Sequence, residues 1–172
     1  MRAVRIATGA LALLGLMGCG YALVGRGSTL PPEVQKVYLS PLVNTTQRSQ
    51  VDQILTRALA SELVTRHRFE VLSAEAGADA RLSGSVLTFA LNPVSFDSEG
   101  RATEYEISIV VKVELKQLSP ERVLYANEGY LFRSSYEVQP SELGYQDRET
   151  PAIESTARDF AETLVTDLLE GF

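Results

Sequence analysis

The sequence contains one cysteine and one histidine among 172 residues. A single cysteine cannot form a disulfide within the chain, so cysteine pairing gives no information on the redox compartment. A structural zinc site of the usual kind takes four ligands from cysteine and histidine, so one chain cannot supply them. The sequence therefore predicts no metal site and no cofactor.

Catalytic motifs are also absent. The patterns GxxxxGK[ST], GxSxG and HExxH do not occur. His67 is the one candidate histidine base, and no motif places a nucleophile beside it. Glu104 and Glu106 share a face of a predicted strand, where they are explained more simply as the solvated face than as a carboxylate pair. We predict that the protein is not an enzyme; a hydrolase that uses Glu104 or Glu106 is the alternative.

An excess of positive charge is missing as well. The net charge is −6, and it becomes −8 if Arg2 and Arg5 are removed with the N-terminal segment. This disfavours a general nucleic-acid binder, which needs a basic face to displace counterions. It also disfavours electrostatic attraction to anionic lipid as the main membrane anchor. With 45% hydrophobic and 22% charged residues, the composition is that of an ordinary globular domain.

The chain has no long hydrophobic run. Residues 6–17 are apolar apart from Thr8, and these 12 residues are too few for a membrane-spanning helix, which needs about 20. A basic start, a short apolar run and small residues are typical of a secretory signal. We therefore predict a signal peptide over residues 1–18.

The apolar run ends in Leu16-Met17-Gly18-Cys19, which resembles a lipobox. We therefore predict that the chain is cut before Cys19 and that this cysteine is lipidated. Two or more acyl chains on the cysteine would anchor the protein stably. The alternative is an ordinary signal peptide with a chance cysteine. Gly20 follows, and the absence of Asp at that position favours the outer membrane. Residues 19–33 are rich in glycine and proline and read as the lipidated N-terminus and a tether.

Residues 34–172 are predicted to form a single domain. It opens with short strands over residues 34–39 and 69–73, which flank an amphipathic helix over residues 47–66. Asn44-Thr45-Thr46 offers N-caps for that helix.

Three longer strands follow, over residues 80–96, 104–116 and 123–136, joined by short turns into an antiparallel meander. The first hairpin could reach about 50 Å, so its tip is expected to extend past the core. On the second strand the buried face is expected to carry Tyr105, Ile107, Ile109, Val111, Val113 and Leu115. On the third strand one face is expected to carry Leu124, Ala126, Tyr130, Phe132 and Tyr136.

A polar loop over residues 137–149 precedes a final amphipathic helix, which Thr150-Pro151 is expected to cap and start. The order of elements is therefore β-α-β-β-β-β-α. Two helices on one face of a sheet give a two-layer α+β sandwich, and here the sheet is expected to be mixed and mostly antiparallel.

Several segments together resemble the lipopolysaccharide-assembly lipoprotein family of the LptE type. They are Cys19-Gly20-Tyr21 with Leu23, Gly25 and Leu30-Pro31, VYLSPLVNTT at 37–46, ADARLSGSV at 78–86, ATEYEISIVVKVEL at 102–115, YLFRSSY at 130–136, and the closing helix. The resemblance implies a non-catalytic lipoprotein of the outer membrane. It implies that the protein partners and plugs a large β-barrel protein, binds lipopolysaccharide and assists its assembly into the outer leaflet.

The resemblance also indicates candidate residues for lipopolysaccharide binding. In the family, cationic residues near the hairpin tip and after the last strand are implicated in this role; here Arg101 is the nearest cation at the tip, and Arg133 matches the Phe-Arg-Ser motif. The alternative is that each is a solvated or ion-paired surface arginine.

Another function also stays open. The chain could be a different outer-membrane lipoprotein module, which regulates a periplasmic enzyme or belongs to a secretion apparatus.

Overall fold

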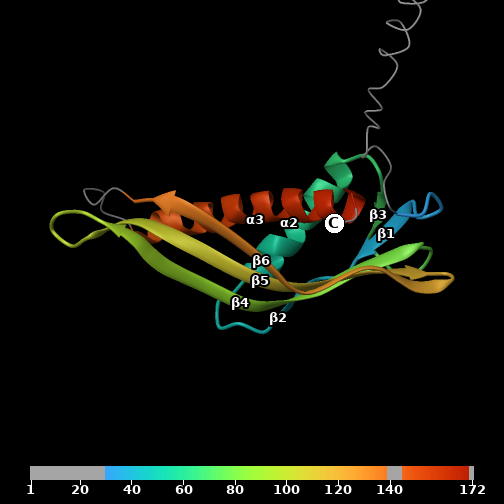
Figure 1. The fold of residues 1–172 in the computed structure, drawn as a ribbon. Coiled ribbons are helices and arrows are strands. Elements are labelled where there is room, and N and C mark those ends of the chain that lie inside the picture. The colour runs from blue at the N-terminus through green and yellow to red at the C-terminus, as the bar shows by residue number, and fades with distance from the viewer. Residues whose placement is uncertain (1–29, 139–144, 171–172) are drawn as a thin grey trace, which may run out of the picture.

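The structure is a computed structural model, and it describes residues 30–138 and 145–170 (Figure 1). The predicted signal peptide, Cys19 and the predicted tether as far as residue 29 lie outside the described residues. Leu30, which belongs to that tether segment, is buried against the core together with Val34.

The described residues form a six-stranded sheet and two helices. The strands are β1 (Lys36–Leu39), β2 (Val43–Asn44), β3 (Glu70–Leu72), β4 (Ala80–Phe96), β5 (Ala102–Leu118) and β6 (Glu121–Glu137), and the helices are α2 (Val51–Thr65) and α3 (Tyr145–Glu170). The strand order is β3-β1-β4-β5-β6, and β2 pairs with β4 beside this path. β1 is parallel to β3 and β4, whereas β5 is antiparallel to both of its neighbours, β4 and β6. The predicted fold class and order of elements are confirmed, and the short strand β2 is added to them.

Both helices lie on the same face of the sheet (Figure 1). The alternation predicted on β5 is confirmed, because its residues Ile107, Ile109, Val111, Val113 and Leu115 are buried. Leucines at every fourth position of α2 and the apolar stripe of α3 complete the core. Each large side chain that is fully buried in this layer contributes roughly 1.5–3 kcal/mol.

Helix α2 begins at Val51, four residues later than predicted. The residues expected to cap it form a loop of their own: the Asn44 side chain accepts a hydrogen bond from the Thr46 backbone N–H (2.9 Å) and donates one to the Arg48 carbonyl (2.7 Å). The N-cap is Gln50 instead, in the left-handed region (φ 65°) and without a side-chain cap.

Helix α3 begins at Tyr145 and contains Pro151, so the predicted start at Thr150-Pro151 is wrong. A proline removes one backbone hydrogen bond and usually marks a helix end. Here the turn before it is held from outside the helix, since Glu149 forms an ion pair with Arg48 at 2.9 Å.

The predicted face of β6 is wrong at Ala126, whereas Leu124 packs against the core as expected. Tyr130 pairs with Val111 and Phe132 with Ile109 on the core side, as expected. A register shift between Val111 and Val113 then changes the alternation. As a result Tyr125, opposite Leu115, lies on the core side, while Ala126, opposite Glu114, lies on the outer side. A bulge of this kind places one extra residue in one strand and turns the following side chains to the other face.

The hairpin of β4 and β5 projects past the start of α3 at the left of Figure 1, as its length predicted. The sheet is therefore longer than the helical layer that covers it.

Candidate functional site

The tip of the β4–β5 hairpin is closed by the carboxylate of Asp97. It accepts hydrogen bonds from the backbone N–H groups of Glu99 and Arg101, both at 2.9 Å, and from the Arg101 Nε at 2.8 Å. The bond from the Arg101 backbone is the largest of the causes that lower the pKa of Asp97 below its ordinary value. Arg101 also pairs with Glu99 at 2.9 Å. The Arg101 guanidinium thus faces two carboxylates, and the tip carries a net negative charge.

Arg133 lies on the outer face of β6, opposite Ser108 of β5. Its Nε is 3.7 Å from a carboxylate oxygen of Glu106, and the side chain is 59% exposed. Arg101 precedes β5, so the strand register separates the two arginines by about 20 Å along the sheet. The structure therefore does not bring them together. For both, the ion-paired alternative describes the geometry, and their role in binding lipopolysaccharide stays a prediction.

The residues considered for catalysis are engaged separately. Glu104 accepts a hydrogen bond from Ser95 (2.9 Å), whereas Glu106 faces Arg133. His67 follows the end of α2 in the left-handed region (φ 52°), and its Nδ1 lies 3.0 Å from the Val64 carbonyl oxygen. These contacts give each of the three residues a structural role in the fold.

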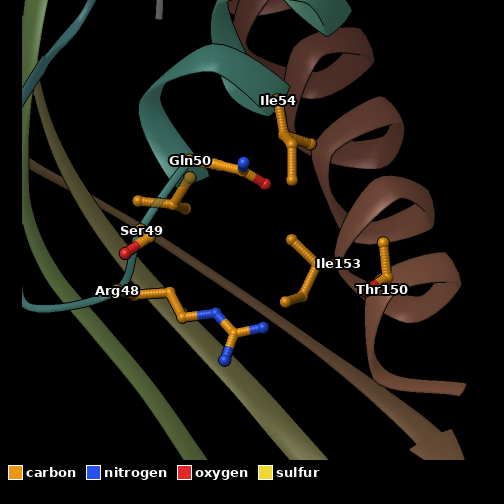
Figure 2. A pocket seen from close by; sticks show the side chains of 7 residues that line it. Arg48, Ser49, Gln50, Ile54, Thr150 and Ile153 are labelled. Atoms are coloured by element: carbon orange, nitrogen blue, oxygen red, sulfur yellow. The ribbon is translucent and has the colours of Figure 1, made fainter. Parts of the chain in front are cut away.

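Arg48 is a residue that sequence reasoning missed. It lines a small cavity of about 40 Å³ between the start of α2 and the first turns of α3 (Figure 2). Besides its ion pair with Glu149, its guanidinium lies 5.9 Å from the centre of the Phe89 ring. Arg48 thus connects the loop before α2 to α3 and to the sheet. A cavity of this size has room for about one water molecule and not for a ligand.

The outer face of the sheet is mixed in character. A polar hollow of about 370 Å³ lies where β2 and β4 meet β5, and it is lined by Ser83, Ser85 and Lys112 among others. The Lys112 ammonium is paired with Glu128 at 2.7 Å. Farther along, the exposed Leu131 lies beside Val110. This face is therefore mainly polar and exposed to solvent, and Leu131 and Val110 form an apolar row on it.

No group of acidic, cysteine and histidine side chains in the described residues could hold a metal ion. In the same residues, neither helix is long and apolar enough to cross a membrane.

Comparison with known families decides the relationship. The model of the lipopolysaccharide-assembly family LptE matches residues 34–168, which is almost the whole described domain. The chain belongs to the LptE family. The resemblance proposed from the sequence segments is therefore confirmed. LptE is a family of non-enzymatic lipoproteins of the cell envelope.

Solved structures share the fold of this LptE chain at low sequence identity. A PelC dodecamer from Paraburkholderia phytofirmans is 17% identical, with 84% of this chain and 94% of that chain covered and a TM-score of 0.52. An uncharacterized lipoprotein B from Nitrosomonas europaea is 16% identical (87% and 90% covered, TM-score 0.55). The rare lipoprotein B from Shewanella oneidensis is 15% identical (78% and 93% covered, TM-score 0.52). No curated protein sequence matches the chain significantly.

Proposed function

We propose that this protein is an outer-membrane lipoprotein that plugs a large β-barrel translocon and assists the assembly of lipopolysaccharide into the outer leaflet. The observation that carries the proposal is the LptE match over residues 34–168. Acyl chains on Cys19 would anchor the protein to the periplasmic side of the outer membrane. The protein acts by binding, with no catalytic step.

The shape and surface of the domain support this role. The lumen of a large barrel is polar, so a plug must present a mainly polar exterior. The outer sheet face does so with Glu106, Lys112 and Glu114, while the helices bury the other face. A lipid anchor would hold the domain close to the mouth of the barrel and raise its effective concentration there.

Gentle solubilisation tests the partnership. The lipidated chain with an affinity tag is purified from membranes in mild detergent, and its partners are identified by mass spectrometry. We expect a large outer-membrane β-barrel protein in stoichiometric amount, and less lipopolysaccharide at the cell surface after depletion of the chain. Recovery of the chain without any barrel protein would contradict the proposal.

The alternative, a different outer-membrane interaction module, has one observation in its favour. The PelC structure with the same fold is a dodecamer, so this fold can assemble with copies of itself. Cross-linking in intact cells separates the two functions. A ladder of homo-oligomers, or a periplasmic enzyme or secretion protein as the main partner, would favour the module.

A further inference from the structure

Two arginines stand apart from the other cations of the domain. Within residues 30–138 and 149–170, Arg57 and Arg158 are the arginines that form neither an ion pair nor a hydrogen bond. The other arginines there bond to a carboxylate, a carbonyl, an amide or a hydroxyl oxygen; they are Arg48, Arg66, Arg68, Arg81, Arg101, Arg122 and Arg133. In an acidic chain, two guanidinium groups without an acidic partner keep their full capacity to bind an external anion.

Both unpartnered arginines line the same groove between α2 and α3. Its volume is about 260 Å³, and its walls include Arg57, Ala58 and Ser61 of α2 and Glu154, Ala157 and Arg158 of α3. Ala157 is buried and Ala58 is half-buried, whereas both arginines are exposed. We name this site the interhelical groove. It has a small apolar floor and a cation on each helix.

The two helices hold the sides of the interhelical groove in fixed positions. Arg66 at the end of α2 donates hydrogen bonds to the Thr166 hydroxyl (2.9 Å) and to the Glu162 carbonyl (3.4 Å) of α3. Leucines of α2 and the apolar stripe of α3 pack into the same core beneath. The spacing of the two helix backbones that carry the arginines is thus set before any ligand arrives, which reduces the ordering cost of binding.

The charge of the interhelical groove favours phosphate over carboxylate. A guanidinium matches the oxygens of a phosphate in bidentate geometry. Glu154 on the same wall leaves a net charge of only +1 among these groups, so a dianionic group is attracted more strongly than a single carboxylate. The apolar floor beside the cations suits an amphiphile, and the groove is larger than a phosphate ion needs.

We propose that the interhelical groove binds a phosphate group on the sugar headgroup of a glycolipid, with lipopolysaccharide as the ligand. This inference rests on the proposed function, and it assigns the contact to the helical layer, away from the hairpin tip. Arg57 and Arg158 would each bind phosphate oxygens from opposite sides of the groove.

The test is a binding titration with the full lipidated chain in detergent micelles. The probes are fluorescently labelled lipopolysaccharide and the same preparation after chemical removal of its phosphates. We expect tighter binding of the phosphorylated form, and a loss of about tenfold for each of Arg57→Gln and Arg158→Gln. Arg122→Gln removes the same charge from the start of β6 and is expected to leave the affinity unchanged. The dephosphorylated probe also measures any mixing caused by the acyl anchor alone.

Each other outcome overturns the proposal. Equal binding of both probes would exclude a phosphate contact, and unchanged affinity in both variants would exclude the groove. If inorganic phosphate alone fully displaces the labelled lipopolysaccharide, the groove is a simple anion site and not a glycolipid site. If the arginine variants lose the barrel partner but keep their affinity for lipopolysaccharide, the groove instead binds an acidic surface of a protein. These results differ from failure of the proposed function, which shows as absence of the barrel from the purified wild-type complex. Thermal unfolding of each variant checks that it folds.

Discussion

At the scale of single residues, Asp79 fastens the turn before β4 to the beginning of β1. One of its carboxylate oxygens accepts hydrogen bonds from the backbone N–H groups of Lys36 (2.8 Å) and Gln35 (3.0 Å). These bonds, with that from Lys36 the larger, lower the pKa of Asp79 below its ordinary value of 3.8. A carboxylate with a lowered folded-state pKa stabilises the fold above the unfolded-state value and loses this contribution as the pH falls through the folded-state value.

Asp79→Asn is therefore expected to lower the free energy of unfolding at pH 7 and to flatten its dependence on pH below about pH 4. Urea unfolding at pH 7 and at pH 3 measures both effects. Glu33→Gln is a matched control, because Glu33 is exposed and forms no hydrogen bond or ion pair within the described residues. A constant difference between Asp79→Asn and wild type at both pH values would contradict the assignment.

At the scale of elements, the outermost strand β6 is attached to the helical layer through an aromatic cluster. The Tyr130 hydroxyl donates a hydrogen bond to Asp167 of α3 at 2.5 Å. The rings of Tyr130 and Phe132 meet Phe160 edge-on, with centroids 5.9 and 6.1 Å away. Burial is the largest cause that raises the pKa of Tyr130 above its usual range, followed by the bond to Asp167. The hydroxyl therefore remains protonated and donates at all ordinary pH values.

Tyr130→Phe keeps the ring and removes this hydrogen bond to a carboxylate. We expect the free energy of unfolding to fall by about 1.5–3 kcal/mol. The substitution should also increase the rate of backbone hydrogen exchange more in β6 than in β4. Tyr38→Phe is the control, since the Tyr38 hydroxyl has no hydrogen-bond partner among the described residues. Equal and small effects of the two substitutions would show that Asp167 contributes little to holding β6.

The elements differ in how far the sequence could predict them. The alternation on β5 is local and was sufficient to find its buried face. The bulge in β6 arises where two strands pair around Asn127, and the first turns of α3, before Pro151, are contacted by Arg48 from a distant part of the chain. Neither has a local signal. The ion pairs at the hairpin tip were foreseeable, because Asp97 lies four residues from Arg101. The interhelical groove was not foreseeable, because its two arginines line one groove only when the helices pack.

At the scale of the whole molecule, the predicted lipid anchor at Cys19 precedes the folded domain, whose first described residue is Leu30. We expect Cys19→Ser to leave the precursor without acyl chains and to release most of the protein from the membrane fraction. Labelling with a radioactive fatty acid followed by membrane fractionation measures this. Normal labelling of the variant would refute the lipobox interpretation. Ser28→Ala, within the same segment, is expected to behave like wild type.

The position of β1 would have a mechanical consequence if Cys19 carries the proposed lipid anchor. This first strand of the domain is hydrogen-bonded on both sides, to β3 and to β4, and Leu30 and Val34 before it are sunk in the core. A force applied through the N-terminal segment would therefore be shared between two sets of strand hydrogen bonds, one to the edge strand β3 and one to β4. The domain should therefore resist unfolding by a force from the membrane. This force would act on the end of the sheet that contains β1, far from the tip of the β4–β5 hairpin.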